Sequence, residues 1–353
     1  MTETNNRIEW LDSLRALAII AVIIIHISSP IVNVTFGENM NFWWIGHIVD
    51  SAVRFAVPLF LMISGATLLT RKYSLKEYYE RRFMRVVLPF LFFMLVYWVF
   101  RWINLPANQQ PHDFNSIIDW GIRLFLEEGI SKHFWFVYML VFLYLIIPFV
   151  GEFVRKLKSE MIIFLLAAWV LLCLISHNFS VNIYLWSGGN ILQKLYIYVL
   201  YLGYMLLGYY LYNIFYVSRN VRLTAVIVYV ITVAVTVLVV FYTSHVKSKL
   251  DLSLYSYLNL NTIIQSAAVF IALKNTSINQ NWLKKLTFTI SDYSYGIYLV
   301  HILVIGVFFN NGIFWTMAHP LISLPALLIL NLGASFVIIF ILRKIPYGKY
   351  ISG

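Results

Sequence analysis

The segment WLDSLRALAIIAVIIIHISSP, residues 10–30, is apolar and long enough to cross a lipid bilayer as a helix, yet it holds Arg15 and His26. Eleven positions separate these two residues, which is about three turns at roughly 100° per residue. Both side chains therefore leave nearly the same helix face, about 16 Å apart along the axis. Because ionisable groups inside a membrane span are costly, such groups tend to mark functional sites.

The apolar character of this segment runs through the whole chain. Apolar residues make up 61% of the 353 positions and charged residues 12%, whereas a soluble domain carries about 25% charged residues. Apolar runs fall near residues 9–30, 49–70, 86–104, 134–151, 160–177, 194–213, 222–243, 258–274, 290–310 and 322–342. The sequence therefore predicts one all-α domain over residues 1–353, a polytopic membrane protein with about ten transmembrane helices. Apolar and acidic residues alternate over residues 114–128, which indicates a helix at the membrane surface.

The distribution of charge predicts how these helices are oriented. Most of the 26 Lys and Arg residues fall in segments on the same side as the amino terminus, so the positive-inside rule predicts that both termini are cytoplasmic. The net charge of +11 is thus mainly a topology signal, and we expect the lipid bilayer and no nucleic acid as a partner. The single cysteine, Cys173, excludes an intrachain disulfide. The eight histidines are scattered along the chain, so we expect no metal site.

Three charged residues accompany His26. Asp12 lies three residues before Arg15 on the same predicted helix and can pair with it. Arg54 lies in the second apolar run at the depth predicted for His26. A guanidinium close to the imidazole would keep it neutral, which is the form that a general base requires. Each residue also has a structural alternative, since His26 can bind a neighbouring helix, Arg15 can anchor the span and Arg54 can extend to the interface.

A basic cluster follows the second apolar run over residues 71–85, RKYSLKEYYERRFMR. A topology determinant that touches anionic lipid would explain most of this cluster. Arginine also suits bidentate binding of phosphate. We therefore expect a phosphorylated cytosolic ligand to be bound by Arg71, Arg81, Arg82 and Arg85, together with Arg15.

On the predicted outer side, His133 and Trp135 open the fourth span. An aromatic belt at the interface accounts for the aromatic residues there, but a histidine and a tryptophan at a cavity mouth also suit a carbohydrate. In the ninth span, Tyr298 and His301 share one stripe at helical spacing. We assign these four residues to substrate binding, with burial of His301 against another helix as the alternative.

Five motifs in order along the chain resemble one known family. They are IEWLDSLR (residues 8–15) with His26, RFAVPLFLMISG (54–65), RRFMR (81–85), HFWF (133–136) and SYGIYLVH (294–301). Together they resemble the acyltransferase-3 family of integral membrane acyltransferases, in particular the single-domain type of the enterobacterial-common-antigen O-acetyltransferases. The motifs cover nearly the whole chain.

The resemblance implies an enzyme with ten spans in the bacterial cytoplasmic membrane. It implies that acyl-CoA, carrying acetyl or a similar acyl group, is the cytosolic donor and that a hydroxyl of a cell-surface or lipid-linked glycan is the acceptor. It makes His26 the catalytic residue and Arg15 its essential companion. We expect His26 to act as general base or through an acyl-histidine. We expect the oxyanion to be stabilised by Arg54, Tyr298 or His301.

Two other functions also fit the sequence. A transporter or exporter of a polysaccharide or small polar solute would also have ten spans with buried charges, and its flux would not need acyl-CoA. A membrane-embedded binding or assembly subunit would use Arg15 and His26 for helix packing and would not bind coenzyme A.

Overall fold

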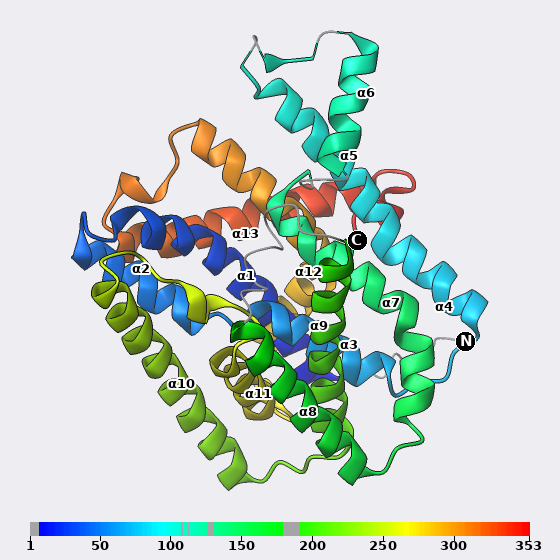
Figure 1. Ribbon diagram of the computed structural model, residues 1–353. Coiled ribbons are helices and arrows are strands. Elements are labelled where there is room, and N and C mark those ends of the chain that lie inside the picture. Colours follow the sequence, from blue (N-terminus) through cyan, green and yellow to red (C-terminus); the bar gives the residue numbers. More distant parts are fainter. Residues whose placement is uncertain (1–6, 107–108, 112, 126–129, 179–190) are drawn as a thin grey trace.

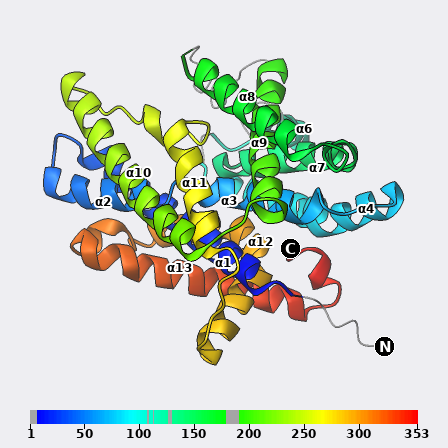
Figure 2. The same cartoon turned by 90° about the horizontal axis from the view of Figure 1, so that it is seen from below.

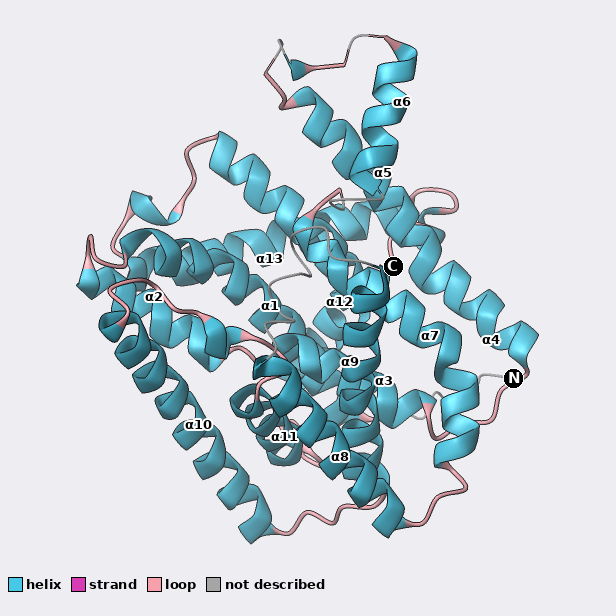
Figure 3. Ribbon diagram, in the orientation of Figure 1, coloured by secondary structure: helices cyan, strands magenta, loops and turns pink. Residues whose placement is uncertain are grey.

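The computed structural model describes residues 7–106, 109–111, 113–125, 130–178 and 191–353 (Figure 1). Within these residues the structure is helical and contains no strand (Figure 3). Ten helical segments are long and apolar enough to cross a membrane, which confirms the prediction of a polytopic all-α membrane protein. These segments are Glu9–Thr35, Met40–Leu68, Leu75–Ile103, Lys132–Val154, Ser159–Ser176, Leu192–Asn213, Arg219–Val246, Ser253–Leu273, Asn281–Asn310 and Pro320–Lys344.

The helix α1 (Glu9–Thr35) lies at the centre of the arrangement (Figures 1 and 2). Its side chains, including Leu14, Ile19 and Ile31, are buried on several faces of the helix. It packs most extensively against α2 (Met40–Ala52), α3 (Ala56–Leu68), α12 (Asn281–Asn310) and α13 (Pro320–Lys344). Because α1 is surrounded by protein, its polar groups face other helices.

The second predicted span is longer than expected and is interrupted. Instead of one helix over residues 49–70, the chain forms α2 from Met40 and α3 from Ala56, with a turn at residues 53–55 between them. Arg54 lies in this turn. Non-helical backbone at membrane depth is tolerated where it is buried in protein, so the break itself indicates a specialised position.

The third predicted span also begins earlier than expected. The basic cluster forms α4 (Leu75–Arg82), and a π-helical turn (Phe83–Val87) joins it to α5 (Leu88–Ile103). Ion pairs between residues four apart, Lys76 with Glu80 and Arg81 with Glu77, support the charged helix. A π-helical turn inside a helix is often found at a functional site.

The surface helix expected over residues 114–128 is present as α6 (Phe114–Arg123), with no buried residue. It begins at the N-cap Asp113, whose side chain accepts a hydrogen bond from the backbone N–H of Ser116 at 3.0 Å. Its exposed residues Phe114, Ile118 and Ile122 recur every four positions and form one apolar face. Residues 126–128 of the expected helix lie outside the described residues. The position of α6 at a membrane surface stays a prediction.

The remaining helices complete the bundle. They are α7 (Trp135–Val154), α8 (Ser159–Asn178), α9 (Ile191–Asn213), α10 (Arg219–Val246) and α11 (Leu260–Leu273). The helices α3 and α9 approach each other closely, because a Cβ atom at Gly65 would lie 1.9 Å from the carbonyl oxygen of Met205. Small residues allow such backbone contact between membrane helices. The helices α10 and α11 pack against each other and against the α2–α3 break (Figure 2).

The two ends of the chain meet at one end of the bundle. The carboxylate of Asp292 on α12 accepts hydrogen bonds from Arg7, at 2.9 Å and 3.1 Å. The backbone carbonyl of Asp292 accepts one from Arg343 at 2.8 Å, and Arg343 also donates to the carbonyl of Gly353. The first described residue, Arg7, and the last, Gly353, therefore lie on the same side of the bundle. That this side is cytoplasmic stays a prediction.

Candidate active site

Arg15 lies near the end of α1 that carries the amino terminus and is held by a buried carboxylate. Its Nη1 donates to Oδ1 of Asp12 at 3.2 Å, so the pairing suggested by their spacing is present. Asp12 also accepts hydrogen bonds from Nε of Arg7 at 2.7 Å and from Oγ of Ser291 at 2.6 Å. Burial lowers the pKa of Arg7, whereas its carboxylate partners Asp12 and Asp292 raise it. The net effect is a rise of the pKa, so Arg7 stays charged. The Arg15 guanidinium is one third exposed and lines a cavity.

This cavity has a volume of about 540 Å³. Among the described residues that line it none is acidic, and the basic ones are Arg15, Arg71, Arg82, Arg85 and Lys349. The other lining residues are mostly aromatic, aliphatic or hydroxyl-bearing, and they include Phe60, Phe136 and Tyr298. The cavity therefore joins a strongly positive region, beside the chain termini, to an uncharged interior between α1, α3, α7 and α12.

The predicted phosphate-binding arginines divide into two groups. Arg82 and Arg85 lie on either side of the start of the π-helical turn, and both line the cavity. The Arg82 guanidinium lies over the rings of Tyr78 and Tyr144, at 5.6 Å and 5.3 Å from their centres. Arg81 is exposed, pairs with Glu77 and is not among the residues that line the cavity.

His26 meets two other histidines near the middle of the bundle. The centroids of the His26 and His301 rings are 5.2 Å apart, and those of His301 and His133 are 5.3 Å apart. Nδ1 of His301 lies 2.6 Å from the carbonyl oxygen of Tyr298, so Nδ1 carries the proton and Nε2 is left as an acceptor. This Nε2 and that of His133 are buried without a hydrogen-bond partner. In the described part of the chain, no three His, Cys, Asp or Glu side chains are grouped to hold a metal ion.

The four residues assigned to substrate binding lie in two places. His133, expected at an outer mouth, is instead buried beside His301 and Tyr298. The Tyr298 hydroxyl donates to the backbone carbonyl of His133 at 2.5 Å, and Tyr298 also lines the cavity. Trp135 packs between Tyr201 and Tyr257, with ring centroids 5.5 Å and 5.9 Å away. Tyr298 thus connects the basic cavity to the histidines, while Trp135 belongs to a neighbouring aromatic cluster.

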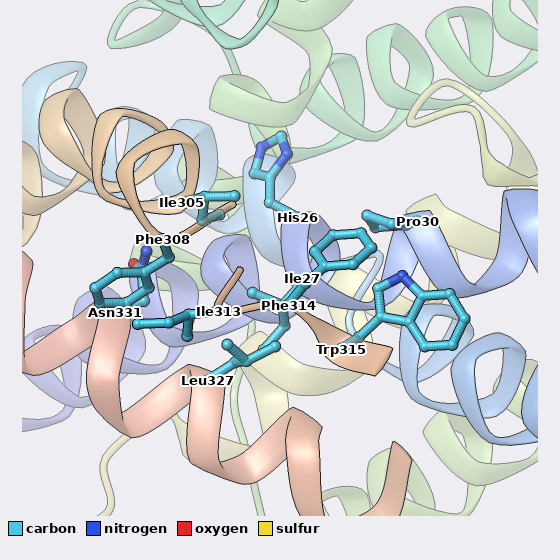
Figure 4. Close-up of a pocket in the computed structure, with 10 residues that line it drawn as sticks. All are labelled: His26, Ile27, Pro30, Ile305, Phe308, Ile313, Phe314, Trp315, Leu327 and Asn331. Carbon is cyan, nitrogen blue, oxygen red and sulfur yellow. The ribbon is translucent and has the colours of Figure 1, made fainter. Parts of the chain in front are cut away.

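A second and much smaller cavity, of about 30 Å³, is lined in part by His26. Its walls are almost entirely apolar, and they include Ile27, Phe314, Trp315 and Leu327 (Figure 4). In Figure 4 the imidazole of His26 points away from the Trp315 and Leu327 side chains. The imidazole therefore lies at the edge of this pocket, on the side away from Trp315 and Leu327.

Arg54 has a partner that the sequence reasoning missed. Its Nη2 donates to the carboxylate of Asp50, one turn earlier on α2, and both side chains are buried. The spacing of four residues between Asp50 and Arg54 was a usable signal, because residues four apart on a helix are neighbours. The charge of Arg54 also acts on the His26 imidazole. That the two residues lie at the same depth in the membrane stays a prediction.

Comparison with known proteins identifies the family. No curated protein and no solved structure matches the chain. A family model for an acyltransferase domain, that of the acyltransferase-3 proteins, matches residues 8–341, which is nearly the whole chain. With ten apolar helices, the protein is a multi-pass membrane protein. The chain belongs to the acyltransferase-3 family and is a membrane acyltransferase.

Proposed function

We propose that the protein transfers a short acyl group, such as acetyl, from cytosolic acyl-CoA to a hydroxyl of a lipid-linked or cell-surface glycan. The reaction takes place in the bacterial cytoplasmic membrane, with His26 as general base. The observation that carries this proposal is the basic cavity, which extends inward to Tyr298, beside the His26–His301 pair.

The charge of the cavity supports a polyanionic donor. Coenzyme A carries phosphates at its nucleotide end, and arginine binds phosphate with paired, charge-assisted hydrogen bonds. Arg15, Arg71, Arg82 and Arg85 line the cavity, and none of its described lining residues has an acidic side chain. Its volume of about 540 Å³ also falls within the range of roughly 300–1,000 Å³ that is usual for ligand pockets.

The change from basic to uncharged walls supports a donor with a long neutral arm. On α3 the lining residues run from Leu68 inward to Phe60, which is about 12 Å along a helix. A pantetheine arm entering past Arg15 would follow these walls toward Tyr298. The rings of Tyr298 and His301 have centroids 5.6 Å apart, and those of His301 and His26 are 5.2 Å apart.

In the proposed reaction, the imidazole of His26 accepts the proton of the acceptor hydroxyl while that oxygen attacks the thioester carbonyl. The tetrahedral intermediate carries a negative oxygen, which Arg54 or another preorganised donor stabilises. Collapse of the intermediate breaks the carbon–sulfur bond. The imidazolium then returns its proton to the thiolate, so the products are the acyl ester and free coenzyme A.

The test uses washed membranes that contain the protein and its natural acceptor, with acetyl-CoA labelled in the acetyl group. We expect label in the glycan fraction and one free coenzyme A thiol for each acetyl group transferred. His26→Ala should lower transfer by about 10²–10⁴-fold, the usual contribution of a general base. His245→Ala, a matched change in the last turn of α10, should retain transfer. Full transfer by His26→Ala would exclude the proposed base.

A further inference from the structure

The break between α2 and α3 is stabilised by other helices. Nε2 of Gln265 on α11 donates to the carbonyl of Ser51 at 2.9 Å and to that of Ala52 at 3.3 Å. The hydroxyl of Tyr229 on α10 donates to the same carbonyl of Ala52 at 2.9 Å. Backbone acceptors that the break exposes are thus satisfied by side chains, as a membrane interior requires. The break, in which Arg54 lies, is therefore held in place by contacts from α10 and α11.

The Arg54 guanidinium is held from two sides. On one side its Nη2 donates to the carboxylate of Asp50. On the other side its Cζ lies 3.7 Å from the centre of the Tyr255 ring, which is a close cation–π contact. Arg54, Asp50 and Tyr255 are all buried. Two supports of different chemistry therefore restrict the rotation of a long and flexible side chain.

The Tyr255 ring is itself fixed by hydrogen bonds. Nε2 of His47 lies 3.0 Å from the carbonyl oxygen of Val237 and must donate to it, which leaves Nδ1 as an acceptor. The Tyr255 hydroxyl donates to this Nδ1 at 2.5 Å. The hydroxyl of Ser51 lies 3.1 Å from the same phenol oxygen. The ring therefore cannot turn away from Arg54 without breaking these bonds.

The two supports leave part of the guanidinium free. Nε of Arg54 is buried and has no hydrogen-bond partner. A buried ion pair is weak evidence for stability, because desolvation of both charges offsets their attraction. A fixed cation with an unpaired N–H in a dry site is, however, well suited to stabilise a developing oxyanion. The helix α1, which carries His26, packs against α2 and α3, the two helices on either side of Arg54, and the charge of Arg54 acts on the His26 imidazole.

We propose that Asp50 is a positioning residue, which holds Arg54 so that the free N–H of the guanidinium stabilises the oxyanion of the tetrahedral intermediate. Tyr255 supports the same arginine through the cation–π contact. This inference rests on the proposed acyl transfer at His26. Asp50 does not touch the reacting atoms and acts only through Arg54.

A double-mutant cycle tests this role, with acetyl-CoA labelled in the acetyl group and washed membranes as the source of acceptor. Arg54→Gln should lower kcat by about 10²–10³-fold, which is the usual effect of removing one oxyanion donor. Asp50→Asn should lower kcat at least tenfold and leave the KM for acetyl-CoA unchanged, because Asp50 does not line the basic cavity. The double variant should be no slower than Arg54→Gln alone, since both changes remove the same interaction.

Controls separate this role from general damage to the fold. Asp119→Asn removes an exposed carboxylate on α6 and should leave kcat unchanged. Each variant should keep the thermal stabilisation that coenzyme A confers. If the Asp50→Asn variant does not accumulate, Tyr255→Leu takes its place in the cycle. This change removes the cation–π contact to Arg54 and keeps the Asp50–Arg54 ion pair. The loss of kcat caused by Tyr255→Leu should likewise not add to the loss caused by Arg54→Gln.

The outcomes distinguish this inference from the proposed function. If wild-type membranes transfer no acetyl group, the proposed function and the role of Asp50 fail together. If the wild type transfers acetyl but the losses of Asp50→Asn and Arg54→Gln multiply, Asp50 acts independently of Arg54 and the inference is overturned. A wild-type kcat in Asp50→Asn would overturn it as well.

Discussion

The imidazole rings of His26 and His301 lie close together, with centroids 5.2 Å apart and planes tilted by 49°, although they belong to the first and the ninth membrane span. Nδ1 of His301 donates to the backbone carbonyl of Tyr298. Its Nε2 is therefore an acceptor, and it has no hydrogen-bond partner. His133 continues this arrangement on the far side of His301. A proton taken up at His26 therefore has a second imidazole close by.

We expect His301→Ala to lower kcat by about 10–100-fold, because it removes an acid–base group beside His26. The KM for acetyl-CoA should stay unchanged, since His301 does not line the basic cavity. Initial rates of labelled acetyl transfer over a range of acetyl-CoA concentrations measure both constants. A raised KM with an unchanged kcat would show that His301 serves donor binding instead.

Arg82→Ala should raise the KM for acetyl-CoA about tenfold, which corresponds to the loss of one hydrogen bond to a charged phosphate, about 1.5 kcal/mol. Arg81→Ala is the matched control, because Arg81 neighbours Arg82 in sequence but pairs with Glu77 away from the cavity. It should leave the KM unchanged. Equal effects of the two substitutions would indicate a general attraction by positive charge rather than a defined site.

Gly65→Ala should destabilise the protein, because the added Cβ would lie 1.9 Å from the carbonyl oxygen of Met205 on α9. Overpacking of this kind costs typically 1–3 kcal/mol or more when backbone must move. Gly333→Ala on α13 is the control, since nothing lies within 4 Å of its Cβ. Thermal unfolding in detergent should give a lower Tm for Gly65→Ala alone. An unchanged Tm would contradict the close α3–α9 contact.

Lys274→Met should also lower the Tm. The Lys274 ammonium donates to the backbone carbonyls of Leu211, Tyr212 and Phe215, at 2.6, 3.0 and 2.7 Å, and thereby satisfies the end of α9. Each buried acceptor left unpaired costs about 1–3 kcal/mol. Lys285→Met, an exposed position on α12, should have little effect. Equal Tm values for the two variants would exclude this capping role.

The sequence predicted the class of fold and much of the basic site. Hydropathy and span length were enough to predict ten membrane helices, because each helix needs its own apolar run. The spacing of Asp12 and Arg15 predicted their ion pair, because residues three apart lie side by side on a helix. Three arginines of the basic cluster, Arg71, Arg82 and Arg85, line the same cavity as Arg15, and their binding of a phosphorylated ligand stays a prediction.

Other parts of the site did not follow from spacing. Arg81 and Arg82 are adjacent, yet one pairs with Glu77 in solvent and the other lines the cavity. His133 was expected at an outer mouth, but it packs against His301 inside the bundle. These differences depend on how each helix is rotated about its axis, which apolar runs leave undetermined when most faces of a helix are hydrophobic.

The sequence alone determined that residues 10–30 span the membrane with Arg15 and His26 on one face, because helix geometry is local and regular. Only the tertiary structure decided what that face meets. It set His301 beside His26, interrupted the second span at residues 53–55, and placed Arg54 between Asp50 and Tyr255. The physical reason is that ring contacts and buried ion pairs join different helices or a helix break, so they arise from packing rather than from periodicity along the chain.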